Sequence, residues 1–224
     1  MKNLIIKITK ILKIYIFLKK INLVLQSKLG MGHGHNLFLF LIRKKNKKIN
    51  YKNFLEIGST REQVYGQGST EIIAKYCEQS KINFISVDAD IRNVNRLRKK
   101  LTKNKYFKSI HDKGENFLKN TNIKFDCIYL DAFDIEKSTK NELRDKFYLE
   151  KYATSITNEM SASIHLEITK NLINKIHNHA IIVFDDTFIK ENLFIGKGEK
   201  AIPFLINLGF KIISSNSNSV ALER

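Results

Sequence analysis

The amino-acid sequence predicts an α/β domain with a doubly wound, mostly parallel sheet. Three observations carry this prediction. Apolar strand-like runs alternate with helical stretches, acidic residues repeatedly follow those runs, and a glycine-rich turn separates the first run from a helix. Parallel strands end at the same edge of a sheet, so residues that follow them come together in space. We therefore expect a binding site along that edge.

Length and cysteine content favour one cytoplasmic domain with an N-terminal appendage. The chain has 224 residues, of which 43% are hydrophobic, enough for a sizeable core. We expect a basic amphipathic extension over residues 1–35 and an α/β domain over residues 36–224. Cys77 and Cys127 show no metal-binding spacing, which favours reduced core thiols. Lysines interrupt the apolar start and no cleavage site follows, so we expect no secretory signal.

The formal net charge of +17 is concentrated at the front of the chain. The first 55 residues contain thirteen lysines and arginines and no Asp or Glu, which leaves +4 for the other 169 residues. Such a segment attracts phosphate groups or anionic lipids. The chain is also rich in Lys, Ile and Asn throughout, so a purely compositional origin of the charge stays open.

The segment from residue 1 to residue 28 predicts a helix with two alternative uses. Lysines and apolar residues occupy different arcs over residues 2–13, and Ile14–Leu18 is wholly apolar yet too short to span a bilayer. The helix could pack against its own domain or a second subunit, giving a homodimer. It could instead lie in an anionic membrane interface, which would place the protein at the inner membrane face.

A glycine-rich break, Leu29–Asn36, precedes a second predicted helix. Asn36 can cap this helix, which ends in lysines as a helix carboxyl end prefers. His33 and His35 invite a metal site, but alternating His and Gly without nearby acids or cysteines is more typical of a turn.

The first strand is predicted around Phe54–Ile57, with Glu56 and Gly58 at its carboxyl end. A glycine-containing turn then leads into a helix. Glycines let the backbone approach a ligand, and Ser69 or Thr70 can cap the helix, whose free N–H groups face the turn. This arrangement suits a nucleotide-type cofactor. Its candidate binding residues are Glu56, Gly58, Ser59, Gly66, Gly68 and Ser69.

Acidic residues follow each later strand. The second strand, Ile82–Asp90, delivers Asp88 twenty residues beyond Gly68, where a carboxylate can accept hydrogen bonds from ribose hydroxyl groups. Three more strands are predicted over residues 106–111, 123–134 and 177–188. They are accompanied by Asp112 and Glu115, by Asp131, and by Asp185 and Asp186 respectively.

The tail of the chain discriminates between variants of this fold. A helix over Gly196–Phe210 is followed by two short apolar segments joined at Asn216–Asn218, which predicts an antiparallel hairpin. A parallel sheet closed by such a hairpin argues against a nicotinamide dehydrogenase and for the methyltransferase variant.

Over Asn36–Arg224 the sequence resembles the class I S-adenosylmethionine-dependent methyltransferases, through FLEIGS, SVDAD, HDKGENFL, FDCIYLDAFD and AIIVFDDTF. The resemblance implies a seven-stranded Rossmann-like sheet with a C-terminal antiparallel hairpin, and S-adenosylmethionine as cofactor. It implies that Glu56, Gly58 and Ser59 lie near the methionine part, Asp88 and Ala89 at the ribose, and Asp112 or Glu115 near adenine. The insertion TREQVYGQ opens the usual glycine cluster, so either Gly66 or Gly68 could approach the cofactor.

Asp131, Asp185 and Asp186 resemble the acidic triad by which catechol-type O-methyltransferases hold Mg²⁺. The resemblance implies that the cation would lower the pKa of a substrate hydroxyl, which then attacks the sulfonium methyl group. Two departures weaken it, since the last position is usually Asn and no catalytic lysine follows Asp131. Capping and solvation of strand ends is the alternative role for these acids.

The connection over residues 135–164 is long enough for a substrate lid. His165 follows as a candidate general base, with a plain surface histidine as the alternative. Lys197 lies in a GKG segment and could face an anionic substrate, or the segment could be a helix-entry turn. Short matches at DAFD, HLE, DDT and GKG also resemble methyltransferases from bacterial cell-surface polysaccharide gene neighbourhoods.

These observations together predict a cytoplasmic O-methyltransferase acting on a hydroxyl of a small molecule or glycan precursor. One alternative is an RNA methyltransferase that grips phosphates with the basic front, but that front lacks interleaved aromatic residues, so nucleic acid is not the expected partner. The other is a non-catalytic binding protein of the same fold.

Overall fold

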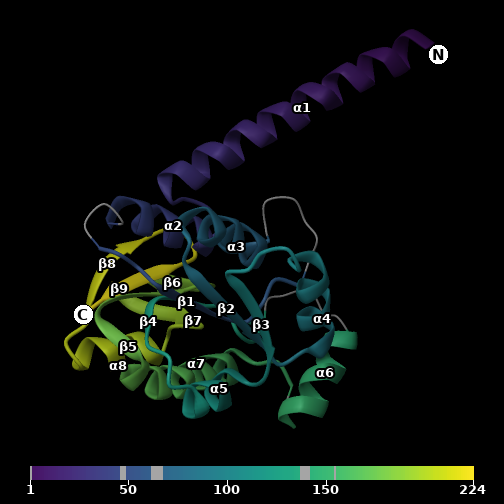
Figure 1. The fold of residues 1–224 in the computed structure, drawn as a ribbon. Coiled ribbons are helices and arrows are strands. Elements are labelled where there is room, and N and C mark those ends of the chain that lie inside the picture. Colours follow the sequence, from purple (N-terminus) through teal and green to yellow (C-terminus); the bar gives the residue numbers. More distant parts are fainter. Residues whose placement is uncertain (1, 46–48, 62–67, 137–141, 154) are drawn as a thin grey trace.

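A seven-stranded sheet lies between two layers of helices in the computed structural model, which describes residues 2–45, 49–61, 68–136, 142–153 and 155–224, without the side chains of residues 2–13 and 142–144 (Figure 1). The strand order is β3-β2-β1-β4-β5-β9-β8. The strands are β1 (Asn53–Ile57), β2 (Asn83–Asp88), β3 (Phe107–His111), β4 (Phe125–Leu130), β5 (Ile176–Phe184), β8 (Lys211–Ser215) and β9 (Val220–Glu223). The first five are parallel, and β9 is antiparallel to both β5 and β8. The predicted sheet and its closing hairpin are confirmed.

Both faces of the sheet are covered by helices because its central strands are apolar on both sides. Phe54, Tyr129 and Ile181 face the layer of α2 (Gly34–Lys45) and α3 (Ser69–Ser80). The alternate residues Leu55, Ile128 and Ile182 face the opposite layer. That second layer consists of α5 (Gly114–Asn120), α7 (Asn158–Leu172) with the short helix η1 (Ile173–Lys175), and α8 (Ala201–Asn207). Two further helices, α4 (Ile91–Lys100) and α6 (Glu142–Tyr152), flank the sheet beside β3 (Figure 1).

The front of the chain forms one long helix, α1 (Lys2–Leu29), that projects from the domain and contacts it through α2 (Figure 1). The helix predicted over residues 1–28 is thus present as one continuous helix, although the side chains of residues 2–13 lie outside the described part. None of the helices in the described part combines the length and hydropathy needed to cross a bilayer.

The start of α2 differs from the prediction. The helix begins at Gly34, so Asn36 lies inside its first turn and does not cap it. Instead, Asn36 Nδ2 donates to the carbonyl of Met31 at 2.9 Å and ties the helix to the preceding turn. His33 and His35 stack with ring centroids 5.3 Å apart. Among the described residues no group of three His, Cys, Asp or Glu side chains could hold a metal ion.

The region after β5 also differs. The fifth strand ends at Phe184, and a separate hairpin of β6 (Thr187–Lys190) and β7 (Leu193–Gly196) follows before α8 starts at Ala201. Its turn places both Glu191 and Asn192 at positive φ, as a two-residue hairpin turn requires. Sequence patterning missed this hairpin because Glu-Asn lacks the glycine that usually marks such a turn.

Candidate cofactor and acceptor site

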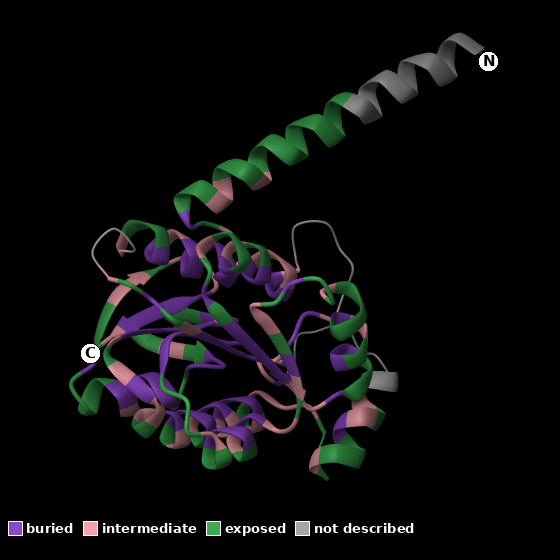
Figure 2. Ribbon diagram, viewed as in Figure 1, coloured by how far each residue is buried: buried purple, intermediate pink, exposed green. Residues whose placement is uncertain are grey.

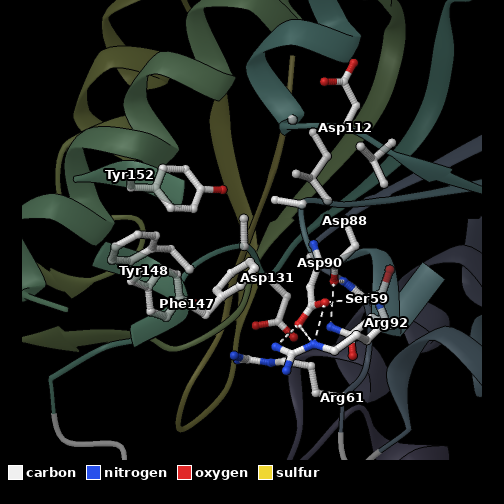
Figure 3. Close-up of a pocket in the computed structure, with 18 residues that line it drawn as sticks. Ser59, Arg61, Asp88, Asp90, Arg92, Asp112, Asp131, Phe147, Tyr148 and Tyr152 are labelled. Atoms are coloured by element: carbon white, nitrogen blue, oxygen red, sulfur yellow. Dashed lines mark hydrogen bonds and ion pairs between the residues drawn. The ribbon is translucent and has the colours of Figure 1, made fainter. Parts of the chain in front are cut away.

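A pocket opens at the carboxyl ends of β1, β2 and β4, where the strand order reverses (Figure 3). Six of the predicted site residues line it, namely Gly58, Ser59, Asp88, Ala89, Asp112 and Asp131. Sequence reasoning thus located the pocket, because acids and glycine at parallel strand ends meet at one edge. Glu56, Gly68, Ser69, Glu115, His165, Asp185, Asp186 and Lys197 are not among the lining residues, and Gly66 lies outside the described part.

Gly58 makes the sharp exit from β1 that forms the pocket floor. Its φ is +93°, a conformation that favours glycine. A Cβ here would lie 2.3 Å from the carbonyl oxygen of Asp131, because the end of β4 passes directly over this turn. Only glycine allows the two strand ends to approach this closely.

Asp88 is held in place by the turn that follows β1. Its Oδ2 accepts a hydrogen bond from Ser59 N at 2.9 Å, and its Oδ1 accepts one from Asp90 N at 2.7 Å. Asn93 Nδ2 also donates to Oδ2, at 3.3 Å. Burial raises the pKa of Asp88, and these donors oppose that effect by stabilising the carboxylate. The carboxylate is thus pre-oriented at the pocket edge before any ligand binds.

Glu56 points away from the pocket into a cluster of hydroxyl groups. Ser69 and Thr70 donate to its two oxygens at 2.9 and 2.7 Å, and Ser86 donates as well. Ser69 and Thr70 therefore do not cap α3, whose N-cap is Gly68. Burial raises the pKa of Glu56 to about 8, against the lowering effect of these hydroxyl groups. Glu56 therefore ties the start of α3 to β1 and β2.

The far end of the pocket is formed after β3. Asp112 lines the pocket, while Glu115 lies in the first turn of α5 and outside the lining. Gly114, which the sequence prediction did not single out, packs so closely on β1 that a Cβ would lie 2.4 Å from Ile57 Cγ2. A close helix-to-strand contact of this kind leaves no period or motif in a single sequence.

An aromatic wall faces the acidic side of the pocket, formed by Phe133 after β4 and by Phe147, Tyr148 and Tyr152 of α6 (Figure 3). The ring centroids of Phe133 and Tyr148 are 4.2 Å apart. Lys113 lies over the Tyr152 ring at 4.6 Å. Helix α6 lies within the long connection predicted as a lid, and three of its aromatic side chains line the pocket.

A polar contact joins this wall to the turn after β1. Arg61 contacts both carboxylate oxygens of Asp134, with Nη1 2.7 Å from Oδ2. Tyr148 donates its hydroxyl to Asp134 Oδ2 at 3.1 Å. The three residues come from the turn after β1, the turn after β4 and α6, so together they fix the width of the pocket. Sequence reasoning did not identify Arg61, which lies within the insertion TREQVYGQ.

The three predicted metal ligands do not converge. Lys197 is 1% exposed, and its Nζ lies 2.5 Å from Asp131 Oδ1 and 2.9 Å from Asp186 Oδ2. Burial alone would lower the pKa of Lys197, but the carboxylates raise it above its ordinary value, so the side chain is a cation. Asp185 turns to the α2 side of the sheet, where Tyr129 donates its hydroxyl to Oδ2. The position between the carboxylates is therefore filled by an ammonium group.

His165 is completely buried, so the alternative of a plain surface histidine is wrong. Its Nδ1 lies 2.8 Å from the carbonyl of Ser161 and must donate to it, which leaves Nε2 as the acceptor. Nε2 has no hydrogen-bond partner in the described part of the chain. Burial lowers the pKa of His165 to about 3, and the Lys197 cation adds to this effect.

Comparison with known proteins agrees with this geometry at the level of the fold. No family model matches the chain, and no curated protein matches it. Among solved structures, the N-methyltransferase NodS from Bradyrhizobium japonicum WM9, bound to S-adenosylhomocysteine, superposes with a TM-score of 0.51 at 15% identity, covering 84% of this chain and 83% of that one. The S-adenosylhomocysteine-bound Podospora anserina methyltransferase PaMTH1 gives 0.50 at 16% identity, covering 84% and 76%. The chain has the Rossmann-like methyltransferase fold.

Within the methyltransferase fold, the pocket occupies the edge where the parallel strands end and the order reverses, which is where open α/β sheets bind ligands. Six residues that the sequence motifs singled out as candidate site residues line this pocket, and their predicted roles stay predictions. The Lys197 contact and the aromatic wall were not predicted, because each depends on segments that only the folded chain brings together.

Proposed function

We propose that the chain is an S-adenosylmethionine-dependent methyltransferase that methylates a hydroxyl group of a small molecule or glycan precursor in the cytoplasm. The observation that carries the proposal is the carboxylate of Asp88, held by Ser59 N and Asp90 N at the end of β2 beside the Gly58 turn. The methyltransferase fold and the two S-adenosylhomocysteine-bound neighbours support it. Cys77 and Cys127, which are buried free thiols, suit that compartment.

In this proposal different residues of the pocket bind different parts of the cofactor. Asp88 would accept hydrogen bonds from the ribose hydroxyl groups. Gly58 and Ser59 would lie along the methionine part, and Asp112 would lie toward the adenine. The aromatic residues of α6 would cover the bound cofactor and exclude water from the sulfonium.

Methyl transfer to a hydroxyl requires an acceptor for one proton. The acceptor oxygen attacks the methyl carbon, the new C–O bond forms as the C–S bond breaks, and S-adenosylhomocysteine leaves. We assign the proton to Asp131, the carboxylate that lines the pocket beside Gly58. Burial raises the pKa of Asp131, which makes it a better base than an exposed aspartate. Lys197 acts as a positioning residue that fixes the Asp131 carboxylate.

Magnesium does not fit the residues present. A hard divalent cation needs several oxygen ligands around one point. Here Lys197 Nζ stands between Asp131 and Asp186, and Asp185 lies on the other side of the sheet, bound to Tyr129. We therefore route no step of the proposed reaction through a metal.

Calorimetric titration of S-adenosylmethionine and S-adenosylhomocysteine tests the cofactor. Asp88→Asn should weaken binding by roughly tenfold or more, because an amide accepts weaker hydrogen bonds than a carboxylate. Asp126→Asn is the matched control, since the buried Asp126 carboxylate also accepts two backbone N–H groups, from Lys52 and Asn53, but lies outside the pocket lining. It should bind like the wild type.

Wild-type protein that binds neither compound would overturn the proposal, and NAD titrated in parallel would then identify a dinucleotide site. With the cofactor established, turnover on a library of hydroxyl compounds and glycan precursors tests the acceptor class. Transfer only to RNA would replace the proposed acceptor with a nucleic acid, and binding without any turnover would indicate a binding protein.

A further inference from the structure

Helix α1 carries an apolar stripe that the domain does not cover. Its residues are spaced three or four apart and so share one face of the helix. They are Ile14, Phe17, Leu18, Ile21, Val24 and Leu25. Their exposed fractions lie between 40% for Ile21 and 62% for Phe17. Monomeric soluble proteins rarely leave a continuous surface of this kind in water, so we expect it to have a partner.

Among the described residues, α1 meets the domain at its carboxyl end, next to α2, so the stripe stands clear of the domain (Figure 1). Met31 N donates to the carbonyl of Gln26 at 2.9 Å, and Asn216 Nδ2 donates to the carbonyl of Gly30 at 2.9 Å. These two hydrogen bonds hold the turn between α1 and α2 in place. Figure 2 shows the described part of α1 exposed along most of its length as it projects from the domain. The apolar stripe therefore faces solvent on a helix whose carboxyl end is held by hydrogen bonds.

The charge of the segment identifies what the stripe would bind. Residues 1–29 contain seven lysines and no acidic residue. Lys19 and Lys20 are exposed; at about 100° per residue Lys20 lies at the edge of the stripe and Lys19 on the opposite face of the helix, while Lys28 lies on the side of the stripe at its carboxyl end. A second copy of this helix would bring the same positive charges together, whereas an anionic bilayer surface would attract them. An apolar face on a helix that carries lysines and no acids is typical of a helix that lies in a membrane interface.

We propose that α1 binds the surface of an anionic lipid bilayer, with its axis along the interface and the stripe facing the acyl chains. This holds whether or not the domain transfers methyl groups. It would concentrate the domain at a membrane surface, and the pocket would then meet acceptors held at that surface.

Co-sedimentation of the full chain with vesicles tests the proposal. The protein should sediment with vesicles of phosphatidylcholine mixed with phosphatidylglycerol, and not with phosphatidylcholine alone. Added salt should weaken binding, because the lysine contribution is screened. The double variant Lys19→Gln with Lys20→Gln should bind at least roughly fivefold more weakly, since a basic residue near an anionic surface, such as Lys20 at the edge of the stripe, contributes about fivefold.

The triple variant Phe17→Ser, Ile21→Ser and Leu25→Ser should lose binding to the mixed vesicles. A matched control changes three similarly exposed residues elsewhere, with Ile189→Ser, Leu193→Ser and Ile195→Ser in the β6–β7 hairpin, and should bind like the wild type. Circular dichroism checks that α1 remains helical in the triple variant. If the helix is lost there, the lysine variant still tests the proposal independently.

Two results would overturn the proposal. One is equal sedimentation of the wild type with charged and uncharged vesicles, or none with either. The other is a dimer, measured by light scattering, that the triple variant converts to a monomer while vesicle binding is unchanged, which would assign the stripe to a second copy of this chain.

Discussion

Lys197 Nζ lies 2.5 Å from Asp131 Oδ1, although the two residues come from turns after different strands. The same ammonium group lies 2.9 Å from Asp186 Oδ2. A buried cation shared by two carboxylates stabilises a cluster that would otherwise be repulsive. This contact accounts for how the carboxylates of Asp131 and Asp186 can lie close together at the edge of the sheet.

Removing the cation should destabilise the domain. Lys197→Met removes the buried cation and leaves the partly exposed carboxylates of Asp131 and Asp186 without their counter-charge, which should lower the free energy of unfolding by about 1.5–3 kcal/mol. Lys200→Met is the control, because the Lys200 ion pair with Glu159 is exposed and should contribute about 1 kcal/mol or less. Urea unfolding measures both. Adding Asp131→Asn to Lys197→Met should recover part of the loss, and equal costs for the two lysine variants would show that the buried cluster contributes nothing.

Divalent cations should not alter the wild-type protein. Since Lys197 fills the position between the carboxylates, neither Mg²⁺ nor a chelator should shift the midpoint of thermal unfolding. In Lys197→Ala the vacated position exposes the carboxylates to solvent ions, so Mg²⁺ should raise the midpoint. A midpoint of the wild type that falls with chelator and returns with Mg²⁺ would contradict this reading of the site.

Gly58→Ala should lower the free energy of unfolding by more than the strain of its left-handed backbone conformation alone. Gly58 and Gly209 have nearly the same φ, +93° and +88°, but a Cβ at Gly209 would meet nothing within 4 Å. Gly209→Ala should therefore lose about 1 kcal/mol from the left-handed conformation. Gly58→Ala should lose a further ~1–3 kcal/mol, because the Cβ forces the Asp131 carbonyl away. Urea unfolding of both variants gives the difference, and similar losses would show that the β4 end yields easily.

Glu56 should make stability fall as pH rises. Burial raises its pKa from 4.5 to about 8 in the folded chain, so the folded state holds this proton more tightly than the unfolded state does. Its stabilising contribution is complete below pH 4.5 and is lost as pH rises toward about 8. Glu56→Gln removes this titration while its amide oxygen can still accept from Thr70 and Ser86, which share one oxygen of Glu56. Urea unfolding at a series of pH values should give a steeper decline for the wild type, and parallel curves would contradict the assignment.

The parallel sheet was predictable because its signals are local. Apolar runs such as the one ending at Ile57 are bounded by turn residues, and acids such as Asp88 mark where the strands stop. The closing hairpin was predictable from the turn at Asn216–Asn218, and β8 and β9 confirm it.

Other parts of the site were not predictable from these signals. A lysine such as Lys197, near a strand end, reads as solvent-exposed, and only the folded chain shows it buried against Asp131. The pairing of Arg61 with Asp134 spans two loops without any sequence pattern. Ser69 and Thr70 have the chemistry of helix caps, but the buried carboxylate of Glu56 competes for their hydroxyl groups. Tertiary partners outweighed local preference in each case.

The two outer strands of the sheet are poor templates for further pairing. Strand β8 carries a charged residue, Lys211, and a register shift between Ile212 and Ser214. At the opposite edge, β3 presents the exposed side chain of Lys108. Lysines and bulges on outer strands oppose the addition of another chain's backbone. The folded domain should therefore resist edge-to-edge aggregation even when α1 gathers many copies on one surface.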